Sequence, residues 1–215
     1  MFERKLLIFD YDGTVVFSFK AFKESLRELL KRLHLEQSFT ERELEFMAKT
    51  TPQIWLPRIL SKISSQKKLK SESVLETFRE IYSRKHLKLI KAVPNVHIVL
   101  KEIKKKNYVL ALTTGRVPIS DFVLIELKYL GLDSLFDLIH VPNRRDKIRL
   151  VKEIIEKVNV RDGIIVGDGV DDIEAGKAFS LKTVAVLYGF TSRDELFRHK
   201  PYYVINRIDE LLEII

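Results

Sequence analysis

Residues 5–14 read K-L-L-I-F-D-Y-D-G-T, an apolar run that ends at two aspartates one residue apart. Residues 6–9 are typical of a strand that is buried on both faces, and the pair Asp12-Gly13 supplies the turn that ends it. In open α/β sheets ligands bind at the carboxyl edge, and we expect the side chains of Asp10 and Asp12 to lie on opposite sides of a group bound there. Two such acids suit a nucleophile beside a general acid, provided that their surroundings hold them in different charge states. The stretch alone fits catalysis and a plain strand end with its turn equally well.

The composition limits the chemistry that the chain can perform. With 215 residues, of which 46% are hydrophobic, it can bury the core of one large domain or of a core with a smaller insertion. The absence of cysteine excludes disulfides, thiolate zinc sites and cysteine nucleophiles. The net charge of +8 favours phosphorylated ligands or a loose association with nucleic acid.

The same sequence predicts where the protein works. Nowhere does the sequence contain eighteen consecutive apolar residues without a charged one, and the first apolar run is too short for the core of a signal peptide. We therefore expect a soluble, cytoplasmic protein with no membrane partner. A charged fraction of 32% without cysteine leans toward a thermophile source.

The hydrophobic pattern divides the chain into two parts. Residues 18–88 show helical spacing throughout, with a capping box at Thr40 and Glu43 and a further helix that starts at Thr51-Pro52. Helices and strands alternate after that block, which predicts an α/β fold with a mostly parallel central sheet. We predict a core made of residues 1–17 and 89–215, with residues 18–88 inserted after the first strand as a helical cap. The later strands are expected at residues 108–113, 136–141, 163–166, 184–187 and 203–205, and helices at 118–130, 146–158, 172–179 and 208–215.

A second acidic cluster repeats the pattern of the first. Residues 164–172 read I-I-V-G-D-G-V-D-D, so that Asp168 falls at a strand end and Asp172 in the first turn of the next helix. If the two strands are adjacent and parallel, Asp10 and Asp168 can bind one hard cation, and we expect that cation to be Mg²⁺. The alternative is a helix start that Asp171 or Asp172 merely stabilises.

Three motifs together resemble the haloacid dehalogenase superfamily of phosphotransferases and phosphohydrolases. They are D-Y-D-G-T at residues 10–14, L-A-L-T-T-G at 110–115 and G-D-G-V-D-D-I-E-A-G at 167–176, in the order and at the spacing of that family. The resemblance implies a Rossmann-like three-layer sandwich with an α-helical cap of the C1 type, similar to phosphoglycolate phosphatases. One departure is Phe17, which stands where relatives with small helical caps often carry aspartate.

The resemblance also implies roles for individual residues. Asp10 resembles the nucleophile that takes the phosphoryl group, and Asp12 resembles the general acid and base. Thr113 resembles the hydroxyl that holds a phosphoryl oxygen, while Thr114 would follow with its backbone N–H. Phosphoryl transfer depends chiefly on positioning and charge neutralisation, which is why carboxylates there require a cation.

The metal site implied by the family uses four of the acids. Asp168 resembles the ligand that binds Mg²⁺ beside Asp10 and the backbone carbonyl of Asp12, and Asp172 resembles the acid that fixes the metal or its waters. All four are present at the expected positions.

The cation that binds the phosphate is less clearly marked. The family supplies a lysine near the start of a helix, and Lys147 in P-N-R-R-D-K-I-R lies in a first helical turn, where its side chain can point back to the strand ends. Arg144 and Arg145 are close enough to take its place. We favour Lys147.

These features predict a Mg²⁺-dependent phosphatase that hydrolyses a small phosphorylated metabolite through an aspartyl phosphate. A phosphomutase of the same superfamily is one alternative, and a non-catalytic phosphate- or nucleic-acid-binding module is another, although the four acids argue against it. We expect no nucleic-acid partner and a monomer or homodimer. The basic residues of the cap are expected to be solvated helix faces or to steer a polyanion; they are Lys67, Lys68, Lys70, Arg84, Lys85, His86, Lys88 and Lys91.

Overall fold

The computed structural model of the protein describes residues 4–63, 69–142 and 144–215. Its centre is a six-stranded sheet in the order β5-β4-β1-β6-β7-β8, in which every neighbouring pair is parallel. This confirms the predicted α/β fold, with the first strand of the chain in the middle of the sheet. The strands are β1 (Lys5–Asp10), β4 (Tyr108–Thr113), β5 (Leu138–His140), β6 (Gly163–Gly167), β7 (Lys182–Val186) and β8 (Tyr203–Ile205).

Side-chain alternation along β1 divides the core into two layers. Leu7 and Phe9 pack on the side of α5 (Val96–Lys104) and of the 3₁₀ segment η3 (Ile208–Glu213). Leu6 and Ile8 pack on the opposite side, against α7 (Lys147–Val158) and α8 (Val170–Ala178). All four side chains are fully buried. A continuous apolar run is what a strand covered by helices on both faces requires, and each such side chain contributes about 1.5–3 kcal/mol by its burial.

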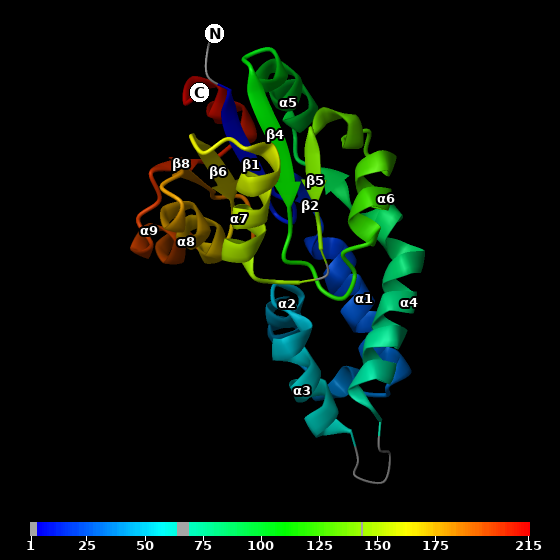
Figure 1. Cartoon of the computed structure of the whole chain (residues 1–215). Helices are drawn as coiled ribbons and strands as arrows, with labels where there is room; N and C mark the ends of the chain where they lie inside the picture. The colour runs from blue at the N-terminus through cyan, green and yellow to red at the C-terminus, as the bar shows by residue number, and fades with distance from the viewer. Residues whose placement is uncertain (1–3, 64–68, 143) are drawn as a thin grey trace.

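A helical insertion lies beyond the carboxyl ends of the strands. The chain enters the insertion through β2 (Val16–Phe17) and returns from it to the six-stranded core through β3 (Lys91–Ala92). These two short strands pair antiparallel. Between them are α1 (Phe19–Arg32), η1 (Glu36–Ser38), α2 (Glu41–Ala48), α3 (Pro52–Lys62) and α4 (Ser71–Leu89), which Figure 1 shows together below the sheet. The Thr40–Glu43 capping box at the start of α2 is confirmed. The boundaries drawn at residues 17/18 and 88/89 stay a prediction.

The structure departs from the predicted elements at several ends. The expected closing helix over residues 208–215 is the 3₁₀ segment η3, whose buried Ile208 and Leu211 are spaced at three residues, the period of that helix. The expected helix at 118–130 begins later, as α6 (Phe122–Tyr129), because a turn carries Ile119 into the core. β2, β3, η2 (Asp133–Leu135) and α9 (Arg193–Arg198) were not predicted.

In the described part of the chain, no helix combines the length and the apolar character that crossing a membrane requires.

Candidate active site

Three strand ends bring the sequence motifs to one edge of the sheet. Asp10 ends β1 and is paired in register with Thr113, which ends β4. Asp168 directly follows β6, the strand on the other side of β1. Because neighbouring parallel strands end at the same edge, residues that are more than a hundred positions apart become neighbours there.

Asp10, Asp168 and Asp172 form a buried acidic group at this edge. Each offers a carboxylate oxygen, and these three oxygens lie within 4.8 Å of one another. Gly13 has a φ of +76° and lies against the group, where an added Cβ would collide with the Asp168 carboxylate. Hard oxygen donors at this spacing are the ligands that Mg²⁺ binds, so the residues present fit the predicted cation. The carboxylate of Asp12 does not belong to the group.

Lys147 is the cation that reaches the acids. It is the first residue of α7, and its buried Nζ lies 2.5 Å from Asp10 Oδ1 and 2.8 Å from Asp172 Oδ1. Arg144 instead pairs with Glu153, at 3.3 Å. Of the three candidates, Lys147 is the one that the structure pairs with Asp10, while Arg145 lines the same cavity.

Burial dominates the electrostatics of this group. It raises the pKa of Asp10 well above its ordinary value, although the Lys147 ammonium acts against it. It also raises the pKa of Asp168 to about 7 and that of Asp172 to about 6. Burial alone would lower the pKa of Lys147, but Asp10 and Asp172 hold it well above its ordinary value. Three carboxylates beside one ammonium have an excess of negative charge when ionised, which a divalent cation would offset.

The two threonines at the end of β4, Thr113 as its last residue and Thr114 directly after it, differ in their contacts. Thr113 is fully buried, and its Oγ1 has no hydrogen-bond partner within residues 4–63, 69–142 and 144–215. Thr114 Oγ1 accepts from the backbone N–H of Arg116 at 3.1 Å and donates to Asp12 Oδ2 at 3.4 Å. An unsatisfied buried hydroxyl is costly, so Thr113 is the better candidate to bind a ligand oxygen.

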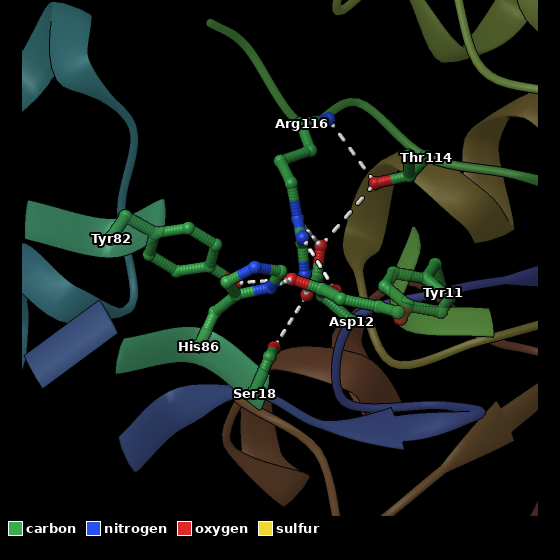
Figure 2. Close-up of polar contacts among 8 residues, drawn as sticks. Tyr11, Asp12, Ser18, Tyr82, His86, Thr114 and Arg116 are labelled. Carbon is green, nitrogen blue, oxygen red and sulfur yellow. Dashed lines mark hydrogen bonds and ion pairs between the residues drawn. The ribbon is translucent and has the colours of Figure 1, made fainter. Parts of the chain in front are cut away.

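The structure adds a residue that the sequence analysis missed. Arg116 donates from Nε to Asp12 Oδ2 at 3.0 Å and from Nη2 to Asp12 Oδ1, and Nη1 donates to Glu126 Oε2 at 2.8 Å. Ser18 also donates to Asp12. Figure 2 shows Arg116 and Ser18 approaching the Asp12 carboxylate from different segments.

A signal for this network was present in the sequence. On α6, Glu126 shares a face with the buried Phe122, Val123 and Leu127. An acid at an apolar helical position needs a buried partner, which directs attention to a nearby arginine.

His86 corrects another expectation. The basic run of residues 84–91 was expected to be solvated, but His86 is 2% exposed, and its Nδ1 lies 2.7 Å from Glu126 Oε1. Its neighbours Lys88 and Lys91 are exposed, as expected. Lys67 and Lys68 lie outside the described residues.

A cavity of about 200 Å³ separates the acidic group from the helical insertion. Asp10, Asp12 and Lys147 line it on the sheet side. The insertion contributes Trp55 and Phe78 on the opposite side. This volume suits a small ligand that presents a charged group to the acids.

Comparison with known proteins agrees with this geometry. The family described as haloacid dehalogenase-like hydrolase matches residues 7–186. The pyrophosphatase PpaX of Bacillus mycoides (strain KBAB4) is 26% identical over 216 residues, which cover 97% of this chain and 95% of the relative. A crystal structure from Clostridium difficile superposes with a TM-score of 0.85 at 22% identity, over 100% of this chain and 99% of that one. The structure of a predicted phosphoglycolate phosphatase from Haemophilus somnus 129pt gives a TM-score of 0.81 at 23% identity, over 100% and 99%.

Proposed function

Since the chain belongs to the haloacid dehalogenase-like hydrolase family and is a hydrolase of phosphate esters, we propose that it is a Mg²⁺-dependent phosphatase. Its substrate in this proposal is a small phosphorylated metabolite, and the reaction passes through an aspartyl phosphate on Asp10. The observation that carries the proposal is the position of Asp10 at the end of the central strand, in contact with Lys147 and next to two further buried acids.

Asp10 is the nucleophile of the first step. One of its carboxylate oxygens forms a bond to phosphorus while the bond between phosphorus and the leaving oxygen breaks. Lys147 offsets the negative charge of the phosphoryl group beside the carboxylate, and the Thr113 hydroxyl donates to one of its oxygens. The unpartnered Oγ1 of Thr113 supports this assignment.

Asp12 moves the proton in both steps. It donates a proton to the leaving oxygen when the aspartyl phosphate forms, and it then takes a proton from the water that attacks phosphorus. That attack breaks the bond between Asp10 and phosphorus and releases inorganic phosphate. The position of Asp12 two residues after the nucleophile, lining the same cavity, supports the pairing.

The carboxylates of Asp10, Asp168 and Asp172 would hold the Mg²⁺ ion, with the backbone carbonyl of Asp12 as a further ligand. When bound, the ion supplies positive charge that the phosphoryl group needs beside three acids. The raised pKa values of the acids fit a site that is completed by a cation.

The size of the cavity and the names of the relatives bear on the substrate. A cavity of about 200 Å³ suits a compact substrate. The relatives include pyrophosphatases, and one similar structure is described as a predicted phosphoglycolate phosphatase. We therefore propose inorganic pyrophosphate and small organic phosphates as the first substrates to test.

The test is release of inorganic phosphate from pyrophosphate, 2-phosphoglycolate and a panel of sugar phosphates, with Mg²⁺ and with EDTA. We expect Mg²⁺-dependent turnover that Asp10→Asn abolishes. Asp162→Asn is the matched control, because Asp162 is an exposed acid that precedes β6 at the opposite edge of the sheet. Unchanged turnover in Asp10→Asn, or an equal loss of turnover in Asp10→Asn and Asp162→Asn, would refute the assignment of Asp10 as the nucleophile.

A further inference from the structure

Arg116 is a buried arginine whose hydrogen bonds go to two acids. It is 6% exposed, it holds both oxygens of Asp12, and it donates to Glu126 as well. The guanidinium carbon lies over the rings of Tyr11 and Tyr82, at 5.0 and 5.6 Å from the ring centroids. A guanidinium that donates to two acids and has aromatic rings beside it has little freedom to turn.

Glu126 accepts hydrogen bonds from both parts of the molecule. It is fully buried and accepts one hydrogen bond from Arg116. It accepts another, at 2.9 Å, from Oη of Tyr11, the residue that follows the nucleophile Asp10 in the chain. From α4 of the insertion it accepts from Tyr82 Oη at 2.9 Å and contacts His86 Nδ1 at 2.7 Å. Figure 2 shows Tyr82 and His86 on one side of Arg116, and Tyr11 and Asp12 on the other.

We propose that Arg116 is a positioning residue, which holds the Asp12 carboxylate in the orientation needed for proton transfer, and that docking of α4 on Glu126 sets the position of Arg116. The inference rests on the proposed function, because it takes the role of Asp12 from there. The geometry supports it: a two-point contact fixes the plane of a carboxylate, whereas a single hydrogen bond leaves it free to rotate.

The coupling to the insertion follows from the cost of unpaired buried charge. When α4 is docked, Tyr82 and His86 satisfy one oxygen of Glu126, and Arg116 and Tyr11 satisfy the other. If α4 moves away, Glu126 loses two partners and is opened to water, which loosens the support of Arg116. Asp12 is thus held most firmly when the insertion covers the cavity.

The decisive variant is Arg116→Lys, which keeps the positive charge and loses the two-point contact. The readout is kcat/KM, which reports only the steps up to formation of the aspartyl phosphate, on two probes. p-Nitrophenyl phosphate has a leaving group that needs little protonation, whereas glycerol 2-phosphate has an alkoxide leaving group that needs it.

We expect Arg116→Lys to lower kcat/KM for glycerol 2-phosphate by about 100-fold and for p-nitrophenyl phosphate by less than about fivefold, because only the first depends on a well-placed acid. Equal losses on both probes would reduce Arg116 to a structural residue and overturn the proposal. A rise in KM at constant kcat would overturn it too, since Arg116 would then bind substrate.

The coupling is tested by Tyr82→Phe, which removes one hydroxyl and keeps the ring. We expect a loss of about three- to tenfold on glycerol 2-phosphate, as for one hydrogen bond, and none on p-nitrophenyl phosphate. The matched control is Asp121→Asn, which breaks the exposed ion pair between Arg79 on α4 and Asp121 at the start of α6. It should not change the ratio of the two kcat/KM values.

A change of that ratio in Asp121→Asn equal to the change in Tyr82→Phe would contradict the proposed route through Glu126. Circular dichroism and thermal unfolding of each variant establish that it is folded. Failure of the proposed function is distinguishable, because the wild-type protein would then release no phosphate from either probe, or Asp10→Asn would remain active.

Discussion

The ammonium group of Lys147 lies 2.5 Å from Oδ1 of Asp10, although 137 positions separate the two residues in the chain. The contact exists because Asp10 ends the central strand and Lys147 begins the helix that packs on the side of β1 where Leu6 and Ile8 point. Alternation sends the Asp10 side chain to that same side.

Lys147→Met should abolish turnover and destabilise the metal-free protein. Removal of the Lys147 ammonium leaves the carboxylates of Asp10 and Asp172 buried without their cation. Losing one partner of a buried ion pair lowers the free energy of unfolding by about 3 kcal/mol or more. Urea unfolding in EDTA measures the stability, and phosphate release measures the activity. Arg144→Met is the control, since Arg144 pairs with Glu153 and should tolerate the change.

Mg²⁺ should stabilise the protein through the acidic group. A ligand at one hundred times its Kd adds about 2.7 kcal/mol to the free energy of unfolding. We expect the melting temperature to rise when EDTA is replaced by Mg²⁺, and Asp168→Asn to abolish most of that rise. Asp171→Asn should keep it, because Asp171 is an exposed neighbour outside the group. An equal rise in all three proteins would mean that the ion binds elsewhere.

Thr113→Val should make the protein less active and slightly more stable. The change removes a buried hydroxyl that has no partner in the described part of the chain, which relieves about 1 kcal/mol of desolvation cost. It also removes the proposed donor to the phosphoryl group, so kcat/KM should fall about 10- to 100-fold.

The matched control for Thr113→Val is Thr183→Val. Thr183 is also buried, but its Oγ1 accepts from the Tyr202 backbone N–H at 2.9 Å. We expect this variant to lose stability and keep its activity. If both variants behave alike in unfolding and turnover, Thr113 has no special role.

Glu126 should make stability depend on pH in the acid range. Burial raises its pKa, but Arg116, His86 and Tyr11 outweigh burial and hold the pKa at about 2, while Tyr82 also donates to it. A carboxyl group whose pKa is lower in the folded than in the unfolded protein stabilises the fold at pH values above its unfolded pKa of 4.5. This contribution is lost as the pH falls toward 2. The shift corresponds to about 3 kcal/mol.

The comparison is between the wild-type protein and Glu126→Gln in unfolding experiments at several pH values. At pH 7 the variant should be less stable by about 3 kcal/mol, and the difference should shrink as the pH falls below 4.5. A difference that stays constant down to pH 2.5 would show that the charge of Glu126 contributes nothing.

Local patterns were sufficient to predict most of the architecture. The apolar run at residues 6–9 predicted the central strand, because a strand buried on both faces is apolar at every position. The helical spacing after residue 18 predicted the insertion, because a helix buried on one face repeats its apolar residues every three or four positions. The ends of elements were less predictable: residues 208–215 read as a helix but form the 3₁₀ segment η3. There the contacts of Ile208 and Leu211 with the core decide the geometry.

For the site, the sequence by itself determined which acids end which strands and that Lys147 begins a helix. Only the tertiary structure decided that Lys147, and not Arg144, reaches Asp10, and that Asp12 is held by Arg116. The sequence does not distinguish three neighbouring basic residues. Which of their side chains contacts Asp10 depends on how the helix is oriented against the sheet, and only the tertiary structure shows that orientation. The Arg116–Glu126 network joins the sheet edge, α6 and the insertion, and side chains from distant segments meet only where packing brings their backbones together.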